Sequence, residues 1–155
     1  MTLAKDFEDF VSLLNRHKVE YMVVGGYALA FHGKPRHTGD LDIWINISEK
    51  NAINMLKAIS DFGLGSLGFE KEDFLTEGLI SQIGYPPLRI DLLNTIDGVE
   101  FNEAILNTQK IELENNLTVN YIGLNDLVKN KEASGRRQDI TDVKTLKKIQ
   151  KGTQL

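Results

Sequence analysis

Three carboxylates and a glycine pair are the residues of this chain whose types and spacing could support chemistry. Asp40 and Asp42 are separated by one apolar residue, and Asp91 lies in a second apolar run. Gly25 and Gly26 end a short apolar run upstream of the aspartate pair. Oxygen ligands without a nearby thiolate favour a hard cation, Mg²⁺ or Mn²⁺. The pattern therefore predicts a site for divalent metal ions and for the phosphates that accompany them.

The aspartate pair lies in a predicted strand over residues 40–47. Alternate residues of a strand share a face, so both carboxylates would point the same way and repel unless a cation lies between them. If a second predicted strand, 88–94, pairs beside it, Asp91 adds a third carboxylate, and three acids can hold two metal ions roughly 3.5–4 Å apart. Asp-x-Asp pairs also occur in turns and on exposed strands. Apolar residues on both sides favour an internal strand, where acids rarely lie without a use.

The glycine pair can bring the backbone close to a ligand because glycine has no Cβ atom. The short helix predicted to follow, over residues 27–31, would offer free N–H groups and a partial positive charge to a phosphate. A plain tight turn is the alternative for two adjacent glycines. Their position just before the aspartate pair favours the phosphate-binding interpretation.

The other elements follow from the periodicity of apolar residues. Helical spacing of four of them predicts an amphipathic helix over residues 3–16, with Phe7, Phe10, Val11 and Leu14 on its inner face. Further strands are predicted over residues 20–24, 79–83, 110–113 and 117–122, and further helices over residues 51–59, 101–106, 125–132 and 139–150. This order indicates an α/β (α+β) fold in which helices flank a mixed β-sheet.

Two of these helices carry more detailed expectations. Ser48 is a good N-cap for the helix over residues 51–59, which should turn Ile53 inward. In the last helix, apolar residues recur every third position from Ile140 to Ile149, which predicts a buried stripe.

Length and composition fit one domain over residues 1–155. The chain has 41% hydrophobic residues, no cysteine and a formal net charge of −4, which is ordinary for a globular protein with its own core. No apolar run approaches the roughly 18 residues of a membrane helix. Acidic residues also occur near the N-terminus, where a signal peptide would be apolar. We therefore expect a cytoplasmic protein without disulfides and without a membrane partner.

Positive charge gathers in the C-terminal segment, about residues 124–151. From residue 129 to residue 151 there are eight basic and three acidic side chains. Such a segment on an acidic body suits a polyanionic ligand, a triphosphate or RNA. A solvated helix face is the alternative.

Two motifs together resemble a known signature. Val24-Gly25-Gly26 followed by Asp40-Leu41-Asp42-Ile43 resembles the polymerase-β-type nucleotidyltransferase superfamily, and Asp91 matches its third carboxylate. The fuller pattern, which adds Tyr27-Ala28-Leu29, His32-Gly33, Arg36 and Thr38, is similar to small bacterial nucleotidyltransferases, including toxins of type IV toxin–antitoxin and abortive-infection systems. The C-terminal helices strengthen this resemblance through Lys131, Gly135-Arg136, Asp139 and Asp142.

The resemblance implies a nucleotidyltransferase fold that ends in a short helical segment, and it implies roles for particular residues. Asp40 and Asp42 would bind both metal ions, and Asp91 would bind the catalytic ion and help to activate the attacking hydroxyl. The two glycines would hold the β- and γ-phosphates. The candidates for holding phosphates or the acceptor are Arg36, Lys131 and Arg136.

The expected function is transfer of a nucleoside monophosphate from a nucleoside triphosphate, such as ATP, to an acceptor hydroxyl. The acceptor could be tRNA or another RNA, a protein or a small molecule, and a toxin-type enzyme fits the pattern. Because the larger helical domain of many relatives is missing, an antitoxin partner or a homodimer could complete acceptor binding. One alternative is a catalytically silent binding partner in a toxin–antitoxin-like complex. Another is a metal-dependent phosphodiesterase or nuclease.

The roles of Trp44 and His32, which lie near the glycine and aspartate motifs, are open to more than one interpretation. Trp44 could stack on a base, although core packing is the commoner role of a tryptophan. His32 could pack or hydrogen-bond beside the site, since the chain's histidines lack metal-ligand spacing.

Overall fold

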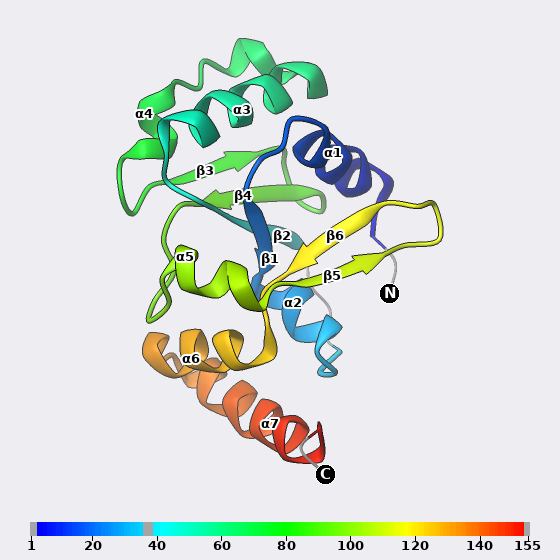
Figure 1. Cartoon of the computed structure of the whole chain (residues 1–155), viewed down its shortest axis with the longest axis vertical. Helices are drawn as coiled ribbons and strands as arrows, with labels where there is room; N and C mark the ends of the chain where they lie inside the picture. Colours follow the sequence, from blue (N-terminus) through cyan, green and yellow to red (C-terminus); the bar gives the residue numbers. More distant parts are fainter. Residues whose placement is uncertain (1–2, 36–38, 154–155) are drawn as a thin grey trace.

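The computed structural model describes residues 3–35 and 39–153, which form one mixed β-sheet with helices against it (Figure 1). The strands are β1 Tyr21–Val24, β2 Asp40–Ile45, β3 Ile80–Ile83, β4 Arg89–Leu93, β5 Gln109–Glu112 and β6 Thr118–Tyr121. The α-helices are α1 Lys5–Arg16, α2 Gly25–Phe31, α3 Glu49–Ile59, α4 Lys71–Leu75, α5 Phe101–Ala104, α6 Leu124–Ser134 and α7 Arg137–Thr153. Short helical turns lie at Ser60–Leu64, Gly65–Leu67 and Ile105–Asn107.

The sheet has the strand order β3-β4-β2-β1-β6-β5. The pairs β1–β6 and β2–β4 are parallel, and the other neighbouring pairs are antiparallel. The predicted strands are all present, with ends that shift by a few residues, and the predicted α/β fold class is confirmed. No helix in the described ranges is long and apolar enough to cross a membrane.

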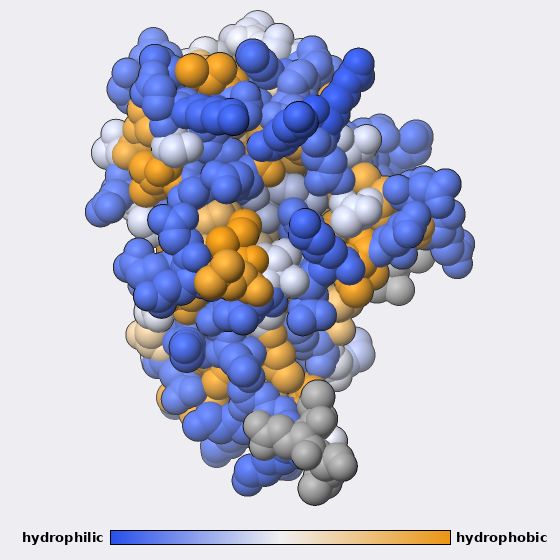
Figure 2. Space-filling view, in the orientation of Figure 1, coloured by the Kyte–Doolittle hydropathy of each residue, from blue (hydrophilic) through white to orange (hydrophobic). Residues whose placement is uncertain are grey.

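The helices pack against the sheet through the apolar faces that the sequence predicted. In α1, the inner face of Phe7, Phe10, Val11 and Leu14 is fully buried. The side chain of Ser48 accepts a hydrogen bond from the backbone N–H of Asn51 at 3.0 Å and so caps α3, as expected. In the face shown in Figure 2, hydrophilic residues predominate and apolar residues form separate patches.

Two details of the predicted faces are wrong. Ile53 is 38% exposed, whereas Asn51 is buried and makes the inward contacts of α3. Its side-chain oxygen accepts the backbone N–H of Glu20 at 2.8 Å, and its amide donates to the backbone carbonyl oxygens of Glu20 and Asn46 at 3.1 and 2.8 Å. In α7, Ile140 is 55% exposed, because the inner face at the start of this helix is formed by Asp139 and Asp142, which are each 1% exposed.

The central strand β2 lies between β1 and β4, so both of its edges are paired. This confirms that the Asp-x-Asp strand is internal. Trp44, two residues beyond Asp42, is 1% exposed and packs edge-to-face on Phe101 of α5, with ring centroids 5.0 Å apart. Trp44 is therefore a core residue.

Candidate active site

The three predicted carboxylates come together through the pairing of β2 with β4. In this parallel pair, Asp42 lies in register with Asp91, and Asp40 lies in register with Arg89. Residues in register on neighbouring strands point to the same face of the sheet, and so do alternate residues along one strand. The three aspartates therefore share one face, as the sequence predicted.

Arg89 lies within this carboxylate group and was not predicted from the sequence. Its Nε donates to Asp91 Oδ1 at 2.9 Å, and its Nη2 donates to Asp91 Oδ2 at 3.1 Å and to Asp40 Oδ2 at 2.6 Å. The guanidinium thus joins the start of β2 to β4. The missed signal is the alternation Arg89-Ile90-Asp91, which places the guanidinium and the carboxylate on the same side of β4.

The glycine turn touches the same site. Gly25 begins α2 with a φ of +67°, a conformation that residues with a side chain rarely adopt. A Cβ atom on Gly25 would overlap Asp42 Oδ2 and would lie 3.0 Å from the Cγ of the same carboxylate. Gly26 follows in the first turn of α2 and is buried. The turn leaves the space that the Asp42 carboxylate fills.

The pKa of Asp42 is raised to about 6, first by burial and then by the negative charges of Asp91 and Asp40, which outweigh the lowering by Arg89 and Lys131. The pKa of Tyr27, on the first turn of α2, is also raised, first by burial and then by the charge of Asp40. These shifts show that the negative charge of the carboxylates is concentrated at one partly buried place.

The chemistry of this donor set fits a hard divalent cation, since it offers carboxylate oxygens and no thiolate. Within the described residues, however, no three acidic or histidine side chains converge as a metal-binding group. Arg89 pairs with two of the three carboxylates instead. The aspartates could hold the cation only after their side chains leave this arrangement.

A second charged group, buried between α6 and α7, contains two more of the predicted residues. Lys131 is 4% exposed, and its Nζ lies 3.1 Å from Asp139 Oδ1 and 3.4 Å from Asp142 Oδ2. The Nε of Arg136 donates to Asp139 Oδ2 at 2.8 Å, and Lys34, beyond α2, reaches Asp142 Oδ1 at 2.7 Å. The network therefore ties α2 to the C-terminal helices.

The two aspartates of this network meet three cations, Lys131, Arg136 and Lys34. Burial would raise the pKa of Asp139, but hydrogen bonds from Ser134, Arg136 and Lys131 prevail and lower it to about 2. The ammonium of Lys131 also lies near enough to lower the pKa of Asp42. The structure thus places Lys131 and Arg136 beside the carboxylate site, with Lys131 engaged by two aspartates and the Arg136 side chain 76% exposed. Arg36, the third predicted phosphate ligand, lies outside the described residues.

Comparisons with known proteins agree with this geometry. Residues 4–155 match the family described as "Nucleotidyl transferase of unknown function (DUF2204)". The chain belongs to this family. No curated protein shows significant sequence similarity to this nucleotidyltransferase family member.

Solved structures show the same fold at low sequence identity. A proposed nucleotidyltransferase from Thermotoga maritima is similar with a TM-score of 0.59 and 14% identity, over 96% of this chain and 92% of that one. An antigenic nucleotidyltransferase-like protein from Paracoccidioides brasiliensis is similar with a TM-score of 0.51 and 14% identity, over 92% of this chain and 76% of that one. The nucleotidyltransferase fold is therefore shown, with the carboxylates and the glycine turn in place.

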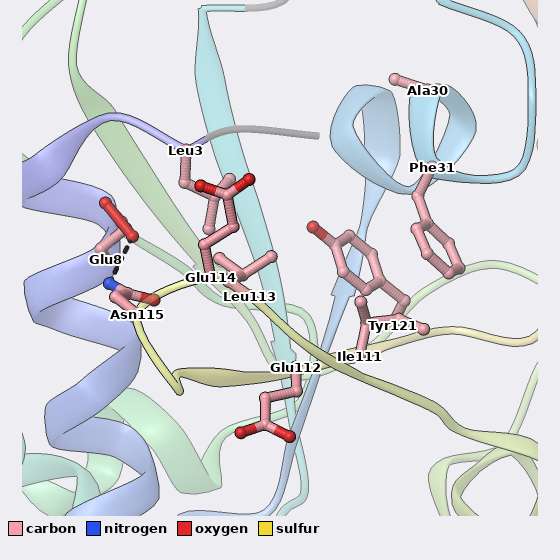
Figure 3. A pocket seen from close by; sticks show the side chains of 10 residues that line it. All are labelled: Leu3, Glu8, Ala30, Phe31, Ile111, Glu112, Leu113, Glu114, Asn115 and Tyr121. Carbon is pink, nitrogen blue, oxygen red and sulfur yellow. Dashed lines mark hydrogen bonds between the residues drawn. The ribbon is translucent and has the colours of Figure 1, made fainter.

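A separate cavity of about 800 Å³ lies between the start of α1, the C-terminal end of α2 and the β5–β6 hairpin (Figure 3). Phe31 and Tyr121 stack in its wall with ring centroids 4.3 Å apart, and Glu8 accepts a hydrogen bond from Asn115 at 2.8 Å. None of the three site aspartates lines it. Near this end of α2, His32 hydrogen-bonds through Nε2 to the carbonyl oxygen of Ile122 at 2.7 Å, so this histidine has a structural partner.

Proposed function

We propose that this family member is a Mg²⁺- or Mn²⁺-dependent enzyme that transfers a nucleoside monophosphate from a nucleoside triphosphate to an acceptor hydroxyl. The observation that supports it is the register of β2 with β4, which aligns Asp40, Asp42 and Asp91 on one face against the Gly25 turn. Nucleotidyl transfer needs this combination, because catalysis of phosphoryl chemistry is mostly positioning and charge neutralisation.

In the proposed reaction, the acceptor oxygen bonds to the α-phosphorus, the bond to the β-phosphate bridge breaks, and pyrophosphate leaves. The bound metal ions would neutralise charge on the phosphates and on the attacking and leaving oxygens. Asp40 and Asp42 would hold these ions. Asp91 would also bind the catalytic ion, and it would orient the acceptor hydroxyl and help to remove its proton.

The residues around the carboxylates would hold the triphosphate. The backbone N–H groups of Gly25 and Gly26 would face the β- and γ-phosphates, because the two glycines bring no side chain of their own to this turn. Arg136 is the better placed of the two described cations, since its side chain is largely exposed while Lys131 is buried between aspartates. Lys131 would act through its charge near Asp42.

The acceptor that we propose is RNA, tRNA included, or a protein. The excess of basic residues from 129 to 151 suits a polyanion and lies on the helices that flank the carboxylate site. A toxin-type role would follow from such an acceptor, with an antitoxin or a second copy of the chain as a regulatory partner. The unit of function would be a single domain spanning residues 1–155.

The test is a labelling assay with each of the four α-³²P-labelled nucleoside triphosphates, Mg²⁺, total tRNA and cell lysate. Wild-type protein is compared with Asp42→Asn and with a matched control, Asp6→Asn, which changes an exposed aspartate in the first turn of α1. We expect label on an RNA or protein band with the wild type and the control, and none with Asp42→Asn.

Other outcomes point elsewhere. Metal-dependent nucleotide binding without any labelled product would favour the catalytically silent partner. Metal-dependent RNA cleavage without added nucleotide would favour a nuclease. Equal labelling by Asp42→Asn and the wild type would show that the assigned roles are wrong.

A further inference from the structure

We infer that Arg89 is a phosphate-binding residue that the site aspartates hold until metal arrives. A divalent cation displaces its guanidinium from Asp40 and Asp91, and the released guanidinium binds the phosphates that come with the cation. This inference rests on the proposed function, since it assumes that the carboxylates take a metal ion and that the ligand is a triphosphate.

The first step follows from the contacts of Arg89. Its hydrogen bonds use both oxygens of Asp91 and one oxygen of Asp40, at 2.6–3.1 Å. Those oxygens are the hard donors that a divalent cation needs. A lone pair that accepts from the guanidinium is not available to a metal ion, and two cations a few ångströms apart also repel each other. Metal binding and the Arg89 ion pairs therefore compete.

The second step follows from where Arg89 stands. It is the first residue of β4, and its side chain is 28% exposed, between 12% for Asp91 and 38% for Asp40. The guanidinium is thus open to solvent and less buried than the Asp91 carboxylate that it covers, on a long side chain that can turn away without moving the strand. Once released, it remains beside the metal site because its Cα is held in register with Asp40 by the β2–β4 pairing.

The third step concerns its new partner. A guanidinium presents a planar fork of donors that matches phosphate oxygens, and such charge-assisted pairs are strong. Lys131 is less suited to this exchange, because its partners Asp139 and Asp142 belong to a different, buried network. Arg89 differs in that its partners are the groups that the cation itself takes. Its release is therefore coupled to the arrival of the triphosphate.

The inference predicts opposite effects of one substitution on two ligands. Removing the competitor in Arg89→Ala should tighten binding of Mn²⁺ alone by about tenfold, the value of roughly one charge-assisted hydrogen bond. The same variant should weaken binding of Mn²⁺–tripolyphosphate by about tenfold, because the phosphates lose a partner. Arg89→Lys keeps the positive charge but not the planar fork of donors, so its affinity for each ligand should lie between that of the wild type and that of Arg89→Ala.

The measurements use the full chain. Free Mn²⁺ is followed by electron paramagnetic resonance, and tripolyphosphate binding in saturating Mn²⁺ is followed by titration calorimetry. Arg16→Ala, at the exposed end of α1, is the matched control and should change neither affinity. Thermal melting of each variant checks that the fold is kept.

The outcomes separate this inference from the proposed function. If Arg89→Ala binds Mn²⁺ no more tightly than the wild type, or binds tripolyphosphate equally well, the exchange is refuted. Should Asp42→Asn then still abolish Mn²⁺ binding, the metal site stands and only the role of Arg89 is wrong. Failure of the wild type and of Arg89→Ala to bind Mn²⁺ at all would refute both.

Discussion

Replacing Gly25 with alanine tests whether the glycine turn keeps Asp42 in place. The added Cβ atom would overlap Asp42 Oδ2 and lie 3.0 and 3.1 Å from the Cγ and Cβ atoms of the same side chain. The carboxylate must then rotate away, at about 0.5–1.5 kcal/mol for an unfavourable rotamer. The φ of +67° adds about 1–2 kcal/mol for an alanine in the left-handed region. We expect the free energy of unfolding to fall by about 2–3 kcal/mol.

The matched control is Gly68→Ala. Gly68 has a φ of +81°, and a Cβ atom there would meet nothing within 4 Å. This variant should lose about 1–2 kcal/mol of stability through the backbone alone. Urea unfolding can be followed by the fluorescence of Trp44, which is the only tryptophan of the chain and is buried in the core.

The two variants should differ more in activity than in stability. A misplacement of a reacting group by about 1 Å can cost 10²-fold in rate. Gly25→Ala should therefore lose nucleotide transfer by about 100-fold, whereas Gly68→Ala keeps the wild-type rate in the same labelling assay. Equal rates for the two variants would refute the reasoning, because the Asp42 carboxylate would then tolerate displacement.

Two further predictions concern the charged groups. Lys131→Met leaves Asp139 and Asp142 buried without their shared cation, and should lower the free energy of unfolding in urea by about 3–5 kcal/mol. The control Lys147→Met, which breaks a half-exposed pair with Glu132 at 3.7 Å, should lower it by less than about 1 kcal/mol. Equal losses would contradict the buried network. The pKa of Asp42 in the folded state, about 6, lies above its ordinary value, so the wild type should lose stability as the pH rises from about 4 to 6. Asp42→Asn lacks this titration. In EDTA, its free energy of unfolding should therefore rise by about 2 kcal/mol relative to that of the wild type between pH 4 and pH 7. A relative gain on acidification instead would show that the pKa of Asp42 is lowered by folding.

Much of the fold could be predicted because apolar periodicity reports directly on burial. The strand alternation around Asp40 and Asp42 and the helical stripe of α1 are examples, and both elements occur where expected. Periodicity fails where a polar side chain finds its partners far away in the sequence. Asn51 displaces Ile53 from the inner face of α3 because backbone groups just before β1 and just after β2 satisfy its amide.

The residues of the site also divide into those that the sequence predicts and those whose partners depend on the tertiary fold. The three aspartates could be predicted, since one strand pairing brings them together. The partners of the basic residues could not, because Arg89 could meet Asp40 only after β2 and β4 had paired. Likewise, Lys131 reaches Asp139 and Asp142 only once α6 and α7 fold against each other. A count of charges shows how many cations are present, but the tertiary fold decides which acid each one meets.

The pairing of β2 with β4 also bears on how members of the family can diverge. These strands are neighbours, yet the chain between them makes a long excursion through α3, α4 and β3 before it returns (Figure 1). The positions of Asp42 and Asp91 depend on backbone pairing, and loop length affects such pairing only weakly. Insertions and deletions between α3 and β3 can therefore accumulate without separating the carboxylates. Relatives can change this outer part of the molecule while the pairing of the inner strands stays the same.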